Sequence, residues 1–154
     1  MTRPDEVSDV EFIQWALGGI DLGVGADMSA LFQNETVIAR LREALAPDAL
    51  VEFATPDGGF MGEMAGPFHG LGGLQRAWAE WTDPWAAWSF TGTEWIDVGD
   101  GRVLLLGDSS GRLAGSGVEM ETHVAALYTI EGDRIVRIQH FLDQGQARRA
   151  AGLD

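Results

Sequence analysis

The apolar positions in the first half of the chain recur at helical spacing and predict three helices. The first is expected over residues 9–20, behind a capping box formed by Ser8 and Glu11. Asn34 offers an N-cap for a second helix, which Pro47 ends, and a third helix stops at Asp83-Pro84. The apolar stripes of the three are Val10, Ile13, Leu17 and Ile20, then Val37, Ile38, Leu41 and Leu45, then Leu71, Leu74, Trp78 and Trp81.

From Trp85 onward the pattern changes to that of β-strands. Four strands are expected, over residues 88–98, 102–110, 117–130 and 134–142, with glycine-containing turns between them, and a shorter one is expected over 49–53. Helices followed by an antiparallel meander predict an α+β fold. Since the chain has 154 residues and no linker-like segment, one domain spanning 1–154 is predicted.

Side chains on a strand alternate between its two faces, so residue parity predicts which of them point into the core. In the third of the four strands the core face is predicted to hold Val118, Met120, Thr122, Val124, Ala126 and Tyr128, with Glu119, Glu121 and His123 outside. In the last strand His140 is in step with Val136, Ile138 and Leu142. A three-residue turn at 131–133 would pair Ile130 with Arg134, and hence Val124 with His140. Both inferences turn His140 inward.

Composition narrows the function classes. A net charge of −14 disfavours nucleic acid and anionic membranes as partners, because binding phosphates requires clustered cations. The ten basic residues are all arginine, which excludes Schiff-base chemistry and a Walker-type phosphate loop and is typical of a GC-rich bacterial genome. With no cysteine, thiolate catalysis, disulfides and thiolate metal sites are excluded. Neither a signal peptide nor a membrane span is evident, so a cytoplasmic location is expected.

Each candidate side chain also has a purely structural interpretation. An inward His140 needs only one hydrogen-bond partner to be a stable core residue, and Tyr128 is equally a core aromatic. His69 lies either at the mouth of a pocket or in a loop. Ser109 falls in a G-x-S-x-G match, but that nucleophile elbow requires a strand followed directly by a helix, whereas turn residues and another strand are expected here.

Several stretches, taken in order, resemble a known family. They are PFHGL at 67–71, W-x-x-W-x-x-P-W at 78–85, IDVGDGRV at 96–103, GSGVE at 115–119, GDRI at 132–135, FLD at 141–143 and AAGL at 150–153. The chain resembles a SnoaL-like member of the nuclear-transport-factor-2-like (NTF2-like) superfamily, best from Ala46 onward. This resemblance implies a cystatin/NTF2-like cone, in which about three N-terminal helices close a strongly curved, antiparallel-rich sheet around an apolar pocket. It also implies a homodimer through the outer sheet face.

The superfamily contains several chemistries, so the site must decide the function. At the positions of the Asp-Arg-Asp set of limonene-epoxide hydrolases this chain has Ser109, Gly107 and His140, so the Arg and both Asp are missing. The Tyr that ketosteroid isomerases take from their first helix is also missing, since Tyr128 is the single Tyr. SnoaL-type cyclases place an acid or base on the inner sheet face, where His140 is expected.

These considerations predict proton transfer on a small hydrophobic carbonyl compound of polyketide, steroid or terpenoid type, by cyclisation, isomerisation or dehydration. His140 is expected to act as general acid or base near its ordinary pKa of about 6.5, without cofactor or metal. Tyr128, Thr122 or Ser109 would polarise the carbonyl. The remaining residues expected to line the pocket are Trp88, Met120, Val124, Ile138 and His69.

Two alternatives stay open at this point. One is a non-catalytic ligand-binding or dimeric scaffold module, in which His140 satisfies only a structural hydrogen bond. The other is epoxide-hydrolase-like activation of a water held by His140, which needs an acid inside the pocket. Asp21 and Asp143 are the nearest candidates for that acid.

Overall fold

A computed structural model of the chain describes residues 8–16, 25–26, 34–53, 68–82, 85–113, 115–141 and 143–153. Helix α1 (Asp9–Ala16) begins at the predicted capping box, where Ser8 Oγ accepts from the Glu11 amide at 3.1 Å. Helix α3 (Glu35–Ala44) begins at Asn34, whose side chain accepts from the amides of Thr36 and Val37. Helix α4 (Gly70–Thr82) confirms the third predicted helix. The end of the predicted helix 9–20 lies outside the described residues.

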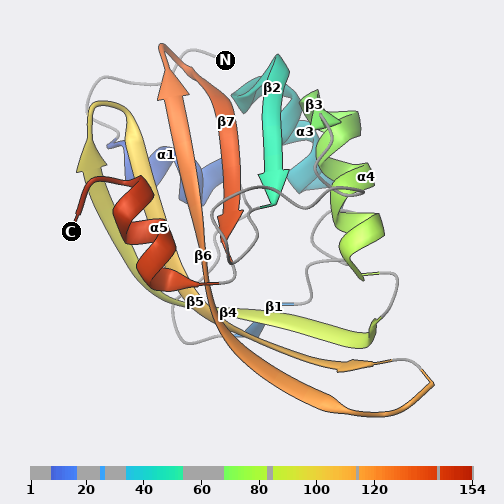
Figure 1. The fold of residues 1–154 in the computed structure, drawn as a ribbon. Coiled ribbons are helices and arrows are strands. Elements are labelled where there is room, and N and C mark those ends of the chain that lie inside the picture. Colours follow the sequence, from blue (N-terminus) through green and yellow to red (C-terminus); the bar gives the residue numbers. More distant parts are fainter. Residues whose placement is uncertain are drawn as a thin grey trace.

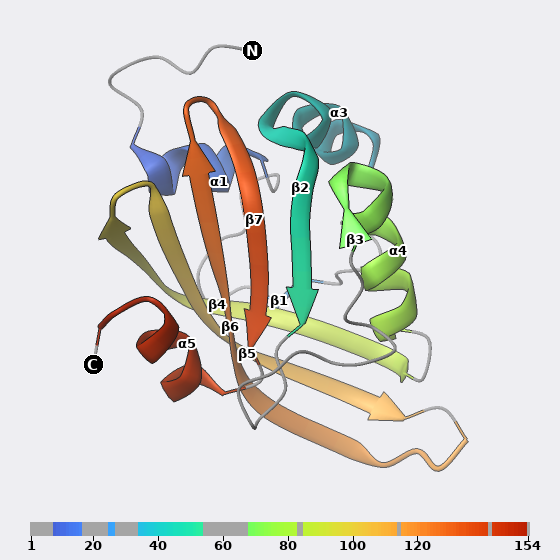
Figure 2. The same ribbon diagram turned by 45° about the horizontal axis from the view of Figure 1, so that its top comes forward.

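The strands form one mixed sheet (Figure 1), whose order is β1-β4-β5-β6-β7-β2-β3. Their bounds are β1 Gly25–Ala26, β2 Leu45–Phe53, β3 Phe68–His69, β4 Trp85–Gly99, β5 Arg102–Leu113, β6 Glu119–Glu131 and β7 Arg134–Phe141. The pairs from β4 to β7 are antiparallel, while β2 runs parallel to β7. The sheet curves strongly, and the ends of the long β5 and β6 project beyond the helices (Figures 1 and 2). The predicted α+β cone is confirmed.

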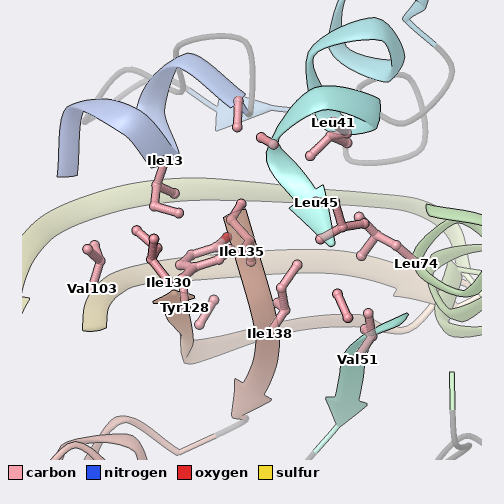
Figure 3. Packing of buried hydrophobic residues seen from close by; sticks show 14 of the residues in the cluster. Ile13, Leu41, Leu45, Val51, Leu74, Val103, Tyr128, Ile130, Ile135 and Ile138 are labelled. Atoms are coloured by element: carbon pink, nitrogen blue, oxygen red, sulfur yellow. The ribbon is translucent and has the colours of Figure 1, made fainter. Parts of the chain in front are cut away.

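Apolar side chains pack on both faces of this sheet. On the inner face α1, α3 and α4 contribute Ile13, Leu41 and Leu74, which pack with Val103 and Ile138 of the sheet (Figure 3). On the outer face a second cluster lies beneath the C-terminal helix α5 (Gln144–Ala150). That cluster consists of Leu104, Leu106, Ala125, Leu127, Phe141, Ala147 and Ala151. The middle of the sheet is therefore covered on both sides.

Helix α5 was not predicted, because its sequence QGQARRA has no apolar stripe and only Ala147 is buried. Its ends explain why it forms. Asp143 is the N-cap and accepts from the Gly145 amide at 2.8 Å. At the other end Arg102 donates to the carbonyl oxygens of Ala150 and Ala151, a favourable place for a cation. The helix is held mainly by contacts distant in sequence.

The predicted register of the last hairpin is wrong, although the predicted face is right. The turn is shorter than expected, since Glu131 pairs with Arg134, and a bulge follows between Thr129 and Ile130. Each feature moves the pairing by one residue, so together they shift it by two and preserve the parity. His140 therefore pairs with Ala126 instead of Val124.

The predicted core face of β6 is correct only for part of its length. Val124, Ala126 and Tyr128 are buried, as predicted, whereas Val118 and Met120 are 52% and 47% exposed. The reason is that β5 and β6 extend past the helices into a projecting hairpin (Figure 2). Parity predicts a face, but it does not predict where the cover over that face ends.

Candidate functional site

His140 lies on the inner face of β7, between Ala126 of β6 and Phe53 of β2 in the pairing register. Its diagonal neighbour on the same face is Tyr128, which pairs with Ile138. Diagonal neighbours in a sheet have Cα atoms about 7–8 Å apart. The two residues expected to carry the chemistry are thus brought together on one face, with Ile138 (2% exposed) beside them.

The surroundings of His140 change its acid–base character. The residue as a whole is partly exposed, but its Nε2 atom is out of contact with water. Burial lowers the pKa of His140 from 6.5 to about 3, because the imidazolium loses its hydration. The expectation of a pKa near 6.5 is therefore wrong for this structure. At neutral pH the ring is uncharged, with one nitrogen able to donate and the other to accept.

Tyr128 belongs to the inner core and is 4% exposed. Burial raises the pKa of its hydroxyl above the usual range, since a phenolate would also lose its hydration. Figure 3 shows its ring among Ile130, Ile138 and Val103. At neutral pH the side chain is a phenol, capable of donating a hydrogen bond to an oxygen that becomes negative.

Two further polar candidates, Ser109 and Thr122, pair across β5 and β6, and Ser109 also pairs with Phe90. Ser109 is 6% exposed, and Thr122 is partly buried. Thr122 lies four residues along β6 from Ala126, the partner of His140, which is about 13 Å at the rise of a strand. Between the two groups lies the pair Gly107–Val124, with Val124 7% exposed. These hydroxyls are thus not neighbours of His140.

The other predicted lining residues lie elsewhere. Met120 is on the projecting hairpin and is exposed. His69 is exposed on β3 and pairs with Leu50, whose partner on β7 is Arg137, so it belongs to the outer face of the sheet. The backbone of Trp88 pairs with Gly111 on β5, and its side chain lies outside the described residues.

Of the two acids considered for water activation, Asp143 is not on the inner face. The Asp143 carboxylate caps α5 and is exposed, while Asp21 lies outside the described residues. Strand β5 runs on through Ser109 to Leu113, so the G-x-S-x-G stretch does not form a nucleophile elbow. Within the described part of the chain no three His, Cys, Asp or Glu residues are grouped so as to hold a metal ion.

Trp95 was missed by the sequence reasoning. A bulge between Gly92 and Glu94 changes the parity of β4, so that Trp95 pairs with Leu105 and packs against the inner core. Its indole Nε1 is buried and has no hydrogen-bond partner among the described residues. Alternation counted from Phe90, which is buried on the inner face, would place Trp95 on the outer face. The Gly92 before it is the sequence signal that could have indicated a bulge.

The outer face carries a groove of about 530 Å³ beside α5. Arg137, one of its lining residues, donates to the Glu52 carboxylate at 2.7 Å from both Nε and Nη2. The lining residues are Leu50, Arg102, Leu127, Thr129, Glu131, Val136, Arg137, Gln139 and Ala150. Farther along the same face, His123 and Asp108 form an exposed pair at 2.5 Å. None of the helices in the described segments is long and apolar enough to cross a membrane.

Comparison with known proteins fits this architecture. The model of the SnoaL-like domain family matches residues 34–138, and the chain therefore belongs to that family. No curated protein matches the sequence.

Solved structures support the same fold at low sequence identity. An NTF2-like protein from Burkholderia thailandensis E264 is 17% identical with a TM-score of 0.64, over 93% of this chain and 96% of the other. A proposed SnoaL-like polyketide cyclase from Jannaschia sp. CCS1 is 12% identical with a TM-score of 0.64, over 100% and 99%. TerC, co-crystallized with polyporic acid, is 13% identical with a TM-score of 0.59, over 94% and 98%. At these identities the likeness establishes the fold alone.

Proposed function

We propose that the protein binds a small hydrophobic carbonyl compound against the inner face of its sheet and transfers a proton with His140. The observation that carries this proposal is the neutral imidazole of His140 beside the Tyr128 phenol on a face lined mainly by apolar side chains. Structural neighbours described as a proposed SnoaL-like polyketide cyclase and as TerC co-crystallized with polyporic acid are consistent with such a ligand. Cyclisation, isomerisation and dehydration all begin with this kind of proton transfer.

In this proposal His140 removes a proton from the carbon next to the carbonyl, and Tyr128 donates a hydrogen bond to the oxygen. The low pKa of His140 makes it a weak base toward an isolated acid. A negative enolate within about 4–6 Å favours the imidazolium, however, and so opposes the effect of burial. The imidazolium then returns the proton at the position where the product requires it. Catalysis depends on forming this ion pair in a site that excludes water.

The test is a ligand screen by thermal shift and native mass spectrometry with polyketide-, steroid- and terpenoid-like ketones, followed by assays for their conversion. His140→Gln is expected to reduce conversion by roughly 10²- to 10⁴-fold, the usual contribution of a positioned acid or base, while binding is retained. His123→Gln, on the exposed outer face, is the matched control and should change neither. Conversion that survives His140→Gln would eliminate His140 as the catalyst.

The depressed pKa of His140 also favours a second candidate, a non-catalytic ligand-binding module. An imidazole that is hard to protonate can serve as a fixed hydrogen-bonding group as well as a base. In that case compounds of the screen bind to the wild-type protein, but none of them is converted. Conversion abolished by His140→Gln would reject this candidate.

We also propose a homodimer through the outer face of β7 and β2. Arg137 and Glu52 are 43% and 12% exposed there in the isolated chain, and the groove beside α5 leaves apolar surface such as Leu50 uncovered. Light scattering should give twice the chain mass of 16.6 kDa. Arg137→Glu would place like charges together against Glu52 and should yield the monomer. A monomeric wild-type protein at micromolar concentration would refute the dimer.

A further inference from the structure

The Nε1–H of Trp95 is a buried donor that forms no hydrogen bond in the described part of the protein. It is out of contact with water and has no acceptor among the described residues, whereas buried donors in native proteins almost always have one. Leaving such a donor unsatisfied costs free energy, because it loses its hydrogen bond to water and gains none. A phenylalanine would fill the same apolar surroundings without this cost.

Trp95 is also placed on the inner face by a β-bulge. The bulge between Gly92 and Glu94 reverses the alternation of β4, and bulges of this kind re-aim side chains near binding sites. As a result Trp95 lies in one cross-strand row with Leu105, Ala126 and His140. The bulge and the unsatisfied N–H are independent observations, and both indicate a group oriented for a ligand.

The exposure of the side chain is consistent with this role. Trp95 as a whole is partly exposed, although its Nε1 faces the interior. A ligand that reaches this partly exposed residue can therefore meet the donor after rotation of a single side chain. The group that satisfies an indole N–H must be an acceptor, which for a largely apolar ligand means a carbonyl or ether oxygen.

We infer that Trp95 donates a hydrogen bond from Nε1 to an oxygen of the bound ligand and so selects ligands that carry an acceptor at this end of the inner face. This inference rests on the proposed function, since it takes the inner face as the ligand site. Trp95 is a positioning and specificity residue in this account. A site with a buried donor discriminates against analogues that lack the acceptor, because the donor then stays unsatisfied.

The probes are 9-fluorenone and fluorene, which share a skeleton and differ in one carbonyl oxygen. The wild-type protein should bind fluorenone more tightly, and Trp95→Phe should reduce that preference by roughly 3- to 10-fold, the range for one neutral hydrogen bond. In ¹⁵N spectra fluorenone, but not fluorene, should shift the indole signal that Trp95→Phe removes. The matched control is Trp15→Phe, another partly buried tryptophan of the inner core, and it should leave the preference unchanged.

Thermal unfolding of the ligand-free variants provides a second readout. Trp95→Phe should leave the melting temperature unchanged or raise it. Trp15→Phe should lower it, because Trp15 stacks on Phe12 and lies 5.4 Å from the Arg40 guanidinium. A fluorenone preference that survives Trp95→Phe, or a loss of stability equal to that of Trp15→Phe, would overturn the inference while leaving the binding site intact. If the wild-type protein bound neither probe, the proposed inner-face site would fail and the inference with it.

Discussion

Strands β5 and β6 pass through two different environments. From Val103 to Gly107 and from Val124 to Tyr128 every residue is buried, because helices cover the inner face and α5 covers the outer one. Beyond this stretch the same strands form a projecting hairpin in which exposed residues dominate, including Val118 and Met120. Burial in this sheet therefore depends on which helices lie across it as much as on the sequence of the strand.

The boundary between the two regions is the pair Gly107–Val124. Outside the sheet, the Gln144 side chain donates to both carbonyl oxygens, at 3.0 and 3.1 Å. Inside, the Phe90 ring lies where a side chain at position 107 would be, since a Cβ there would be 2.4 Å from it. His140 and Tyr128 lie on the covered side of this boundary, which explains why Tyr128 and the Nε2 atom of His140 are buried.

Truncating side chains of β6 to alanine should give the largest difference between the covered region and the projecting hairpin. Leu127→Ala, in the doubly covered region at 2% exposure, is expected to reduce the free energy of unfolding by about 2–5 kcal/mol. Met120→Ala, on the hairpin of the same strand, should change it by less than about 0.5 kcal/mol. Urea unfolding of the two variants measures both values. Equal losses would show that the hairpin is covered in solution.

The stability of the covered region should depend on pH through His140. Because its folded pKa is about 3 and its unfolded pKa is 6.5, the unfolded state binds more protons as the pH falls. The free energy of unfolding is therefore unaffected by protonation of His140 above pH 6.5 and falls progressively as the pH is lowered toward 3. The expected decrease between pH 7.5 and pH 5 is roughly 2 kcal/mol. Denaturant unfolding of wild type and His140→Phe at the two pH values measures it as the difference between their pH dependences. Identical pH dependence in the two proteins would contradict it.

The boundary itself can be tested with two glycines. Gly107→Ala should destabilise the protein by about 1–3 kcal/mol, because the added Cβ meets both the Phe90 ring and the Thr91 carbonyl oxygen, 2.6 Å away. Gly72→Ala, on α4 with open space around it, should instead stabilise by about 0.5–1 kcal/mol. Thermal melts separate the two signs. A neutral Gly107→Ala would mean that the sheet bends without this close contact.

The outer cover should be the least sensitive element. Asp143→Ala removes the N-cap of α5 and is expected to cost about 1 kcal/mol. Hydrogen exchange should then increase at the amides of Gly145 and Gln146, which the carboxylate accepts from. Asp133→Ala, at the partly exposed turn before β7, is the control and should leave exchange in α5 unchanged. Unaltered exchange in Asp143→Ala would show that tertiary contacts alone hold the helix.

Much of the fold could be predicted from the sequence because its signals are local. The caps at Ser8 and Asn34 are properties of neighbouring residues and are found in the structure, as is the alternation of β6 between residues 124 and 128. Helix α5 could not be predicted, because Arg102, almost fifty residues away, binds its last carbonyl oxygens. The inward side of Trp95 was likewise hidden by a bulge that simple alternation does not include.

For the candidate site, the position of His140 was predictable and its protonation state was not. Two shifts in the hairpin preserved its face, whereas its pKa depends on burial in the folded chain, which the local sequence does not determine. The distance of Ser109 and Thr122 from His140 could not be predicted either. Parity places them on the shared face, but their distance along β6 follows only from the register.

The central claim is that the His140 ring is turned into the covered inner face and is neutral at physiological pH. NMR titration of the protein with ¹⁵N-labelled histidine rings, with His140 assigned from His140→Gln, tests it directly. The His140 signals should stay those of a neutral imidazole from pH 8 down to pH 5, consistent with a pKa of about 3. Half-protonation of His140 near pH 6.5 would contradict the account, since a ring with that pKa would be in contact with water.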